Sequence, residues 1–294
     1  MADTLRLGLC QMTSTTSHAG NVAWLGDVAR RAAAEGAQML ALPEVAGLMQ
    51  RDVALARAQV VAHDDDPWVA ACREAAARHG MWVHTGSTPV RGPDGPDGPR
   101  FLNRSDLVDA RGEIVATYDK VHLFDIALDG QTPTGESRRF APGERAVLAA
   151  TPWGPVGMSV CYDVRFPHLY RAYAQAGAAL LFVPAAFTVP TGRAHWEVLL
   201  RARAIENGAY VVAAAQVRRH DDGRDTWGHS MVVDPWGRIV GDLGGEAPGL
   251  RVLELDLAAV ADARRQIPSL RHDRPYELVR APAGAPATPA RVGA

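Results

Sequence analysis

Three polar residues, far apart in the chain, each come at the end of an apolar segment with the composition of a β-strand. Glu44 follows the segment QMLAL and Pro43, Lys120 follows IVATY and Asp119, and Cys161 follows VGMSV directly. A strand end places its side chain at the rim of a sheet, where a ligand can reach it. We therefore expect these three side chains to be available to a substrate.

Together, the three residues could hydrolyse an amide through a covalent thioester. A cysteine thiol needs a base before it becomes a nucleophile, which Glu44 could supply to Cys161. The carbonyl oxygen needs a positive group as it becomes negative, and Lys120 could provide it. The departing nitrogen needs a proton donor. Each residue alone also has a simpler explanation. Cys161 could be a packed thiol, Glu44 an acid near the start of a helix, and Lys120 a solvated surface residue.

Other combinations of residues remain open at this stage. A base of the papain type could come from His122, His195 or His229, although none is needed if Glu44 acts as the base. The acidic run His63–Asp66 could bind a metal, but it is also typical of a solvated turn before a helix. No recognised zinc or magnesium ligand spacing is present, so we expect no metal. Cys10 and Cys72 fit packing positions.

The elements that must position these residues alternate between strand and helix patterns. Predicted strands are Leu5–Met12, Gln38–Leu42, Met81–Ser87, Phe101–Asp109, Glu113–Tyr118, Val156–Val160, Ala178–Val183, Tyr210–Gln216, Ser230–Val233, Arg238–Asp242 and Leu250–Leu255. Predicted helices include Val22 to Glu35, Pro67–His79, Pro167–Gln175, His195–Asn207 and Leu257–Gln266. Such mixing predicts a layered α/β protein in which helices cover sheets.

Two segments lack either pattern, and no linker divides the chain. The run Arg91–Arg100, RGPDGPDGPR, predicts a surface loop. The aperiodic stretch Asp119–Arg145 is long enough to be functional. We expect residues 1–280 to form a single domain. The Ala- and Pro-rich tail, residues 281–294, is expected to be disordered.

Composition excludes several classes of function. The formal net charge of −2 gives no electrostatic reason to bind nucleic acid or an anionic membrane. No apolar run approaches the roughly 20 residues that span a bilayer, and we expect no secretory signal. Three scattered cysteines do not form a disulfide framework, so a reducing cytoplasm is the expected location.

The segments ALPE, YDKVHLFD and CYDVRFP, in this order, resemble the three signature motifs of the nitrilase superfamily of carbon–nitrogen hydrolases. The resemblance covers about residues 5–280 and continues through GRAHWEVLLRARAIENGAYVVAAAQ and WGHSMVVDPWG. These later stretches look most like the branch that contains deaminated glutathione amidase and omega-amidase.

The resemblance implies a four-layer αββα sandwich, assembled as a homodimer or larger oligomer, without a metal or organic cofactor. It implies Cys161 as nucleophile, Glu44 as general base and acid, and Lys120 as oxyanion stabiliser, with the backbone N–H of Tyr162 as second oxyanion donor. Glu136, followed by Ser137 and by Pro142-Gly143, matches a second glutamate of this branch. Its expected role is to position Lys120.

The expected reaction is hydrolysis of a small carboxylate-bearing amide to an acid and ammonia. Expected substrate-binding residues are Tyr162, Arg165, Phe187, Thr188 and His195. Arg165 could instead pair with Asp163, and Arg193 is a second candidate for the substrate carboxylate. Alternative functions are N-carbamoyl-amino-acid or nitrile hydrolysis, or a non-catalytic interaction scaffold. A scaffold would have no need to keep all three reactive residues.

Overall fold

The computed structural model describes residues 3–95, 98–127 and 134–280 of the 294-residue chain, which contain two main β-sheets. The first sheet has the order β14-β13-β1-β2-β3-β5-β4, with β17 paired to β1 and β6 paired to β5. Its strands are β1 (Thr4–Met12), β2 (Met39–Ala41), β3 (Trp82–His84), β4 (Thr88–Gly95), β5 (Gly98–Val108), β6 (Ile114–Asp119), β13 (Ala215–Arg219), β14 (Asp225–Trp227) and β17 (Gly249–Asp256).

The second sheet has the order β16-β15-β12-β11-β10-β9. Its strands are β9 (Val147–Ala149), β10 (Val156–Met158), β11 (Leu180–Phe182), β12 (Tyr210–Ala213), β15 (Met231–Val233) and β16 (Ile239–Asp242). The helices are α1 (His18–Ala34), α2 (Val53–Gln59), α3 (Pro67–His79), α4 (Pro167–Gln175), α5 (Val189–Asn207) and α6 (Ala258–Gln266). A small ribbon, β7 (Asp125–Ile126) with β8 (Thr134–Gly135), and the 3-10 turns η1 (His63–Asp65), η2 (Glu136–Arg138), η3 (Cys161–Arg165) and η4 (Ser269–Arg271) complete the chain.

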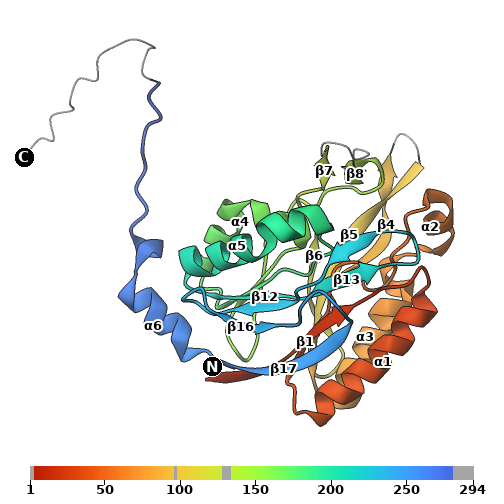
Figure 1. Cartoon of the computed structure of the whole chain (residues 1–294), viewed down its shortest axis with the longest axis horizontal. Helices are drawn as coiled ribbons and strands as arrows, with labels where there is room; N and C mark the ends of the chain where they lie inside the picture. Colours follow the sequence, from red (N-terminus) through yellow and green to blue (C-terminus); the bar gives the residue numbers. More distant parts are fainter. Residues whose placement is uncertain (1–2, 96–97, 128–133, 281–294) are drawn as a thin grey trace, which may run out of the picture.

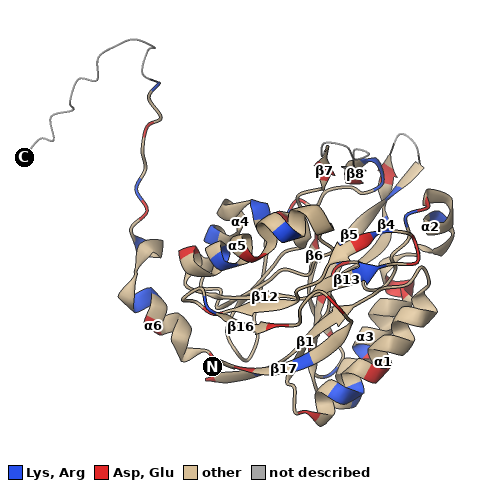
Figure 2. Cartoon of the chain, viewed as in Figure 1, with Lys and Arg blue, Asp and Glu red and all other residues tan. Residues whose placement is uncertain are grey.

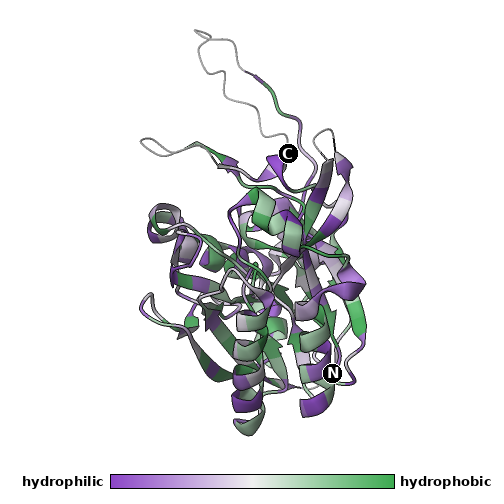
Figure 3. Cartoon of the chain, turned by 90° about the vertical axis from the view of Figure 1, so that its right-hand side faces the viewer, coloured by the Kyte–Doolittle hydropathy of each residue, from purple (hydrophilic) through white to green (hydrophobic). Residues whose placement is uncertain are grey.

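The sheets and helices form four layers, which confirms the predicted αββα sandwich. Helices α1 and α3 lie on one side of the molecule and α4 and α5 on the other, with the sheets between them (Figure 1). Acidic and basic residues are interspersed on these outer helices (Figure 2). The helices carry hydrophilic as well as hydrophobic residues, as outer layers should (Figure 3).

Alternating side chains of the first sheet enter two different cores. Met39 of β2 is buried in the cluster that also contains Met158 and Leu181 of the second sheet, so this cluster fills the space between the sheets. The next residue, Leu40, is buried with Trp68 of α3. This alternation is the period of two expected for a strand with both faces covered. Ala41, the last residue of β2, and Met158, the last residue of β10, both lie in the cluster between the sheets, so the two strands end beside the same interface.

The segment Arg91–Arg100 was wrongly predicted to be a loop. Except for residues 96–97, which lie outside the description, it extends the β4–β5 hairpin, with Asp94 opposite Pro99. Strand β4 lies at the end of the sheet, where a proline costs no ladder hydrogen bond. The sequence rule that excludes proline from central strands does not apply at such an edge.

The prediction of one strand over Tyr210–Gln216 was also wrong, because the structure divides this segment between the two sheets. Strand β12 pairs with β11 in the second sheet, whereas β13 pairs with β1 in the first. Helix α5 also begins earlier than predicted, at Val189, with Pro190 in its first turn.

The structure describes only part of the chain that the predicted domain limits concern. The inter-sheet cluster includes residues from Leu5 to Val260. Residues 281–294, predicted to be disordered, lie outside the described residues, so the boundary at residue 280 stays a prediction. Within the described part of the chain, no helix is long and apolar enough to span a membrane.

Candidate active site

Glu44 lies just beyond β2 and is almost fully buried. Its Oε1 accepts hydrogen bonds from Asn103 Nδ2 (3.0 Å) and Lys120 Nζ (2.9 Å), and its Oε2 accepts one from the backbone N–H of Ala186 (2.8 Å). Val45, the next residue, has a φ of 48°, a left-handed conformation that is strained for a β-branched side chain. Three donors from different elements thus fix the carboxylate in one position.

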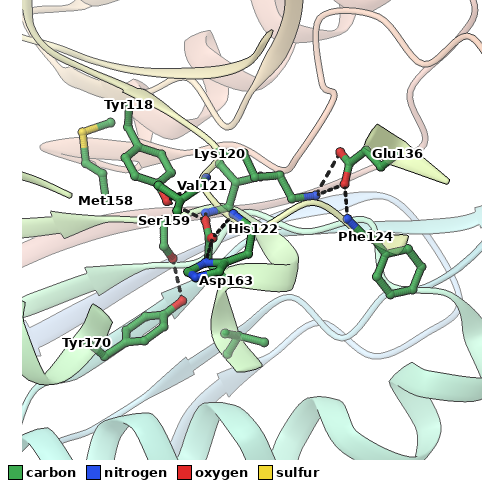
Figure 4. A network of polar contacts seen from close by, with 12 residues as sticks. Tyr118, Lys120, Val121, His122, Phe124, Glu136, Met158, Ser159, Asp163 and Tyr170 are labelled. Carbon is green, nitrogen blue, oxygen red and sulfur yellow. Dashed lines mark hydrogen bonds and ion pairs between the residues drawn. The ribbon is translucent and has the colours of Figure 1, made fainter. Parts of the chain in front are cut away.

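Lys120, just after β6, lies between the carboxylates of Glu44 and Glu136. Figure 4 shows its contacts with Glu136. Its Nζ is 2.9 Å from Glu44 Oε1, and 3.1 and 2.9 Å from Oε1 and Oε2 of Glu136. Glu136 is held in turn by the backbone N–H of Phe124, which donates to Oε2 at 2.7 Å. Burial favours the neutral amine, but Glu136 and Glu44 outweigh it and hold the pKa of Lys120 well above its ordinary value. Lys120 is therefore a fixed positive charge.

Cys161 is the first residue of η3 and is buried with a φ of 52°. Its backbone N–H donates to the carbonyl of Pro184 at 2.8 Å, which anchors the turn to the segment after β11. The Glu44 carboxylate and the Lys120 ammonium group are close enough to act on the thiol electrostatically. Burial and then Glu44 raise the pKa of the thiol well above its ordinary value, although Lys120 and the N–H of Ala186 act in the opposite direction. Together these influences favour the neutral thiol over the thiolate.

Asp163 holds the turn that carries Cys161. Its Oδ2 accepts from the Tyr118 hydroxyl (2.7 Å) and the Val160 N–H (2.8 Å), while His122 donates to Oδ1 from its backbone N–H at 3.0 Å and lies 2.7 Å from it through Nδ1 (Figure 4). The suggested ion pair between Arg165 and Asp163 is therefore wrong, because other donors already occupy this buried carboxylate.

Asp163→Asn is expected to lower the free energy of unfolding by roughly 1.5–3 kcal/mol or more, since an amide cannot accept from donors on both sides of this buried group. Urea denaturation measures the change. The control is Asp262→Asn, which removes only an exposed ion pair with Arg265 and should cost about 1 kcal/mol or less. Equal effects of the two substitutions would contradict a structural role for Asp163.

A cavity of about 800 Å³ opens at this cluster. Its lining includes Glu44, Lys120, Glu136 and Cys161, together with three of the predicted substrate-binding residues: Tyr162, Phe187 and Thr188. The other two, Arg165 and His195, are not among the described lining residues. Arg165 Nη2 is instead 3.3 Å from Nδ1 of His195, and its guanidinium lies 5.8 Å from the Tyr162 ring and 5.6 Å from the Phe187 ring.

The histidines considered as alternative bases lie elsewhere in the described structure. His122 pairs with Asp163, His195 with Arg165, and Nδ1 of His229 with Asp242 at 3.0 Å. Among the described residues, no group of three or more His, Cys, Asp and Glu side chains could hold a metal ion. His63, at the start of the acidic run, pairs through Nε2 with Asp106 at 2.8 Å.

Two groups of the site were missed by sequence reasoning. Asn103, which donates to Glu44, lies on the same inward face of β5 as the buried Phe101 and Ser105, so a polar residue at an inward position was a detectable signal. The N–H of Ala186 carried no signal, because backbone groups do not differ between residue types.

The family model for carbon–nitrogen hydrolases matches residues 6–265. A curated relative, the deaminated glutathione amidase of Yersinia enterocolitica, is 44% identical over 240 residues, which cover 81% of this chain and 82% of the relative.

Solved structures of the nitrilase superfamily are also similar to this chain. Nit3 of Saccharomyces cerevisiae, described as a member of branch 10 of the nitrilase superfamily, superposes with a TM-score of 0.80 at 27% identity, covering 91% of this chain and 96% of that one. A mutant amidase from Nesterenkonia sp. AN1, described with acrylamide added to its active-site cysteine, gives a TM-score of 0.72 at 32% identity, covering 90% and 98%. The chain described here belongs to the carbon–nitrogen hydrolase family and is a hydrolase of carbon–nitrogen bonds.

Proposed function

We propose that this protein is a cysteine-dependent amidase that hydrolyses a carboxylate-bearing amide, of the type of deaminated glutathione or an omega-amide of a 2-oxo acid. The observation that carries the proposal is that the Glu44 carboxylate, paired with the Lys120 ammonium group, lines the same cavity as Cys161. The relative named deaminated glutathione amidase supports the substrate class, and the acrylamide-modified cysteine of the related amidase supports the nucleophile.

In the first half-reaction, Glu44 takes the thiol proton of Cys161 as Sγ attacks the amide carbonyl. Lys120 stabilises the negative oxygen that develops, together with the backbone N–H of Tyr162. Glu44 then gives its proton to the leaving nitrogen, and the carbon–nitrogen bond breaks. The products are a thioester on Cys161 and the free amine or ammonia.

In the second half-reaction, Glu44 removes a proton from water as the water oxygen attacks the thioester. The carbon–sulfur bond breaks, the acid leaves, and Cys161 recovers its proton from Glu44. Glu136 takes no part in the proton transfers. Its contact with Lys120 keeps that ammonium group charged and in place.

A panel of amides with a product readout tests the proposed function. Deaminated glutathione should release the dipeptide cysteinylglycine, and 2-oxoglutaramate, the omega-amide of a 2-oxo acid, should release ammonia. We expect at least one of them to be preferred over N-carbamoyl amino acids and nitriles by a hundredfold or more in kcat/KM. Preferred hydrolysis of an N-carbamoyl compound or a nitrile would replace this proposal with one of those activities.

The raised pKa of the Cys161 thiol predicts an unusual pH dependence for its alkylation. Because its pKa is raised, the fraction of thiolate in the free enzyme should stay small at neutral pH and grow as the pH rises. The rate of alkylation by iodoacetamide, measured at Cys161 by peptide mapping, should therefore continue to increase beyond pH of about 8.5, where an ordinary thiol is half ionised. A plateau already reached near pH 6 would instead indicate a preformed thiolate.

Arg165 and His195 remain proposed contacts of the substrate's acyl carboxylate, next to the cavity-lining rings of Tyr162 and Phe187. Arg165→Lys should raise KM for a carboxylate-bearing amide by roughly tenfold or more, because lysine cannot reproduce a two-pronged hydrogen bond. Hydrolysis of a neutral amide of similar size is the control. Equal losses on both amides would assign Arg165 to structure.

We also propose that the protein forms a homodimer or larger assembly and works in a reducing cytoplasm. Large apolar side chains are exposed on and near the outer helices, including Val198 and Ile205 of α5 and Ile267 after α6. The three cysteines are all free thiols, which suits a reducing compartment. Light scattering coupled to size-exclusion chromatography tests the assembly, and a 31.5 kDa monomer would contradict it.

A further inference from the structure

Three arginines line the same cavity as Cys161 but take no part in the proposed chemistry. They are Arg51, just before α2, Arg139, just after η2, and Arg224, just before β14, here called the arginine group. Among the described residues, none of the three hydrogen-bonds to Glu44, Lys120 or Cys161. The cavity wall therefore carries a second group of charged side chains, separate from Glu44, Lys120 and Cys161.

Arg139 is held rigidly at this wall. Its Nη1 and Nη2 donate to the carbonyls of Arg51 and Gln50, both at 3.0 Å, and its guanidinium lies 5.9 Å from the rings of Phe101 and Phe140. These bonds use two of the five N–H donors of a guanidinium. Its Nε is buried and has no hydrogen-bond partner in the described structure. A planar cation is thus fixed in place with donors left over.

The charge of Arg139 is not neutralised by direct contact. No described carboxylate lies within ion-pair distance of it, whereas Arg224 is paired with Asp222 through Nε at 2.7 Å. Burial and then the neighbouring charge of Arg224 lower the pKa of Arg139, while Asp222, Asp52 and Glu136 act more weakly in the opposite direction. A bound anion would relieve this repulsion.

The described carboxylates near the arginine group do not fully neutralise its charge. Asp225 lines the cavity, but it is paired with Arg219 at 2.8 Å. Arg51 is exposed, and no described carboxylate pairs with it. An incoming carboxylate would therefore meet more positive than negative charge, and guanidinium groups bind carboxylates through two parallel hydrogen bonds.

We propose that the arginine group, with Arg139 at its centre, binds a second carboxylate of the substrate, on the leaving-group side of the scissile amide. This inference rests on the proposed function. Arg51 follows Glu44 along the same segment, and Arg139 follows Glu136, so the group adjoins Glu44, which would protonate the leaving nitrogen, and Glu136, which holds Lys120. The cavity of about 800 Å³ is in the upper part of the range of roughly 300–1,000 Å³ that holds extended ligands.

The inferred contact selects an extended amide over a short one. In deaminated glutathione, the leaving cysteinylglycine ends in a glycine carboxylate, which the arginine group would bind. In 2-oxoglutaramate the leaving group is ammonia, so no group of that substrate reaches this end of the cavity. The arginine group would thus determine specificity for the leaving group and not for the acyl part.

The test compares deaminated glutathione with its glycine carboxamide, which lacks only the terminal charge. The unmodified enzyme should prefer the free acid by roughly tenfold or more in kcat/KM. Arg139→Gln should reduce that preference to about twofold, mainly through a higher KM for the acid. Because Arg139 also holds two backbone carbonyls, Arg51→Gln provides a second variant that disturbs no described contact, and it should reduce the preference as well. Arg138→Gln, an exposed neighbour that does not line the cavity, should keep the full preference.

The outcomes separate this inference from the proposed function. If 2-oxoglutaramate or deaminated glutathione is hydrolysed but the enzyme does not distinguish acid from carboxamide, the inference is wrong and the amidase function stands. A preference that survives both Arg139→Gln and Arg51→Gln also overturns it. If none of the three amides is hydrolysed, the proposed function fails, and this inference fails with it.

Discussion

Cys161→Ala is expected to reduce amide hydrolysis below detection, the largest effect of any single substitution in this chain. In the proposed mechanism the variant removes the atom that forms the thioester, and the neighbouring groups cannot replace it, because Glu44 already serves as the base. The methyl group of alanine fits the space of a buried thiol, so folding should be preserved. The measurement is kcat/KM for the preferred amide, with circular dichroism to confirm the fold.

Cys10 and Cys72 provide matched controls for this substitution. Both thiols are fully buried in the core between the first sheet and helices α1 and α3. Burial raises the pKa of each thiol, as it does for Cys161, but Cys161 also lines the cavity together with Glu44 and Lys120. Cys10→Ala and Cys72→Ala should therefore retain activity, with a modest loss of stability. Substantial activity in Cys161→Ala would refute the covalent mechanism.

Lys120→Met is expected to lower kcat by at least 10²–10³-fold, roughly the cost of removing one oxyanion donor. Methionine keeps the length of the side chain but removes the charge. The loss should exceed that of a simple donor, because two carboxylates would then face each other without the cation that separates them. Repulsion would favour protonation of one carboxylate, and a protonated Glu44 cannot act as a base.

The same substitution is expected to affect stability, which needs a separate measurement. Removing one partner of a buried ion pair commonly costs roughly 3–5 kcal/mol. Lys120→Met with Glu136→Gln removes the charge from two members of the cluster together and should recover part of the lost stability without recovering activity. If Lys120→Met keeps activity within about tenfold of the parent, Lys120 is not an oxyanion donor.

Much of this site was predictable because its signals are local. Glu44, Lys120 and Cys161 each end an apolar strand, and a polar residue at such a position is visible in the sequence. The pKa of the Cys161 thiol was not predictable in this way, because Lys120 lowers it while burial and Glu44 raise it by more. Glu136 lies in the aperiodic segment Asp119–Arg145, and only the family resemblance indicated it. Its contact with Lys120 depends on how the segment folds back.

Other features depend on tertiary contacts that leave no local pattern. The apolar run Tyr210–Gln216 is continuous, yet the chain passes between sheets at Ala214, which no periodicity records. Helix α2 is a single short segment whose Asp52 cap was not recognised. The sequence gives no sign that Arg139 lies in the cavity wall, because its position there depends on packing against Phe101 and Phe140. The charge of the cavity was therefore not predictable from residue types alone.

The most direct test of the account is the mass of Cys161 during turnover. The enzyme is mixed with excess amide, quenched in acid within milliseconds to seconds, and digested for peptide mapping. We predict an acyl increment on the peptide that contains Cys161, removable by hydroxylamine as a thioester should be, and absent from the peptides of Cys10 and Cys72. Acylation of another residue, or acid formation at full rate by an enzyme whose Cys161 is blocked, would contradict it.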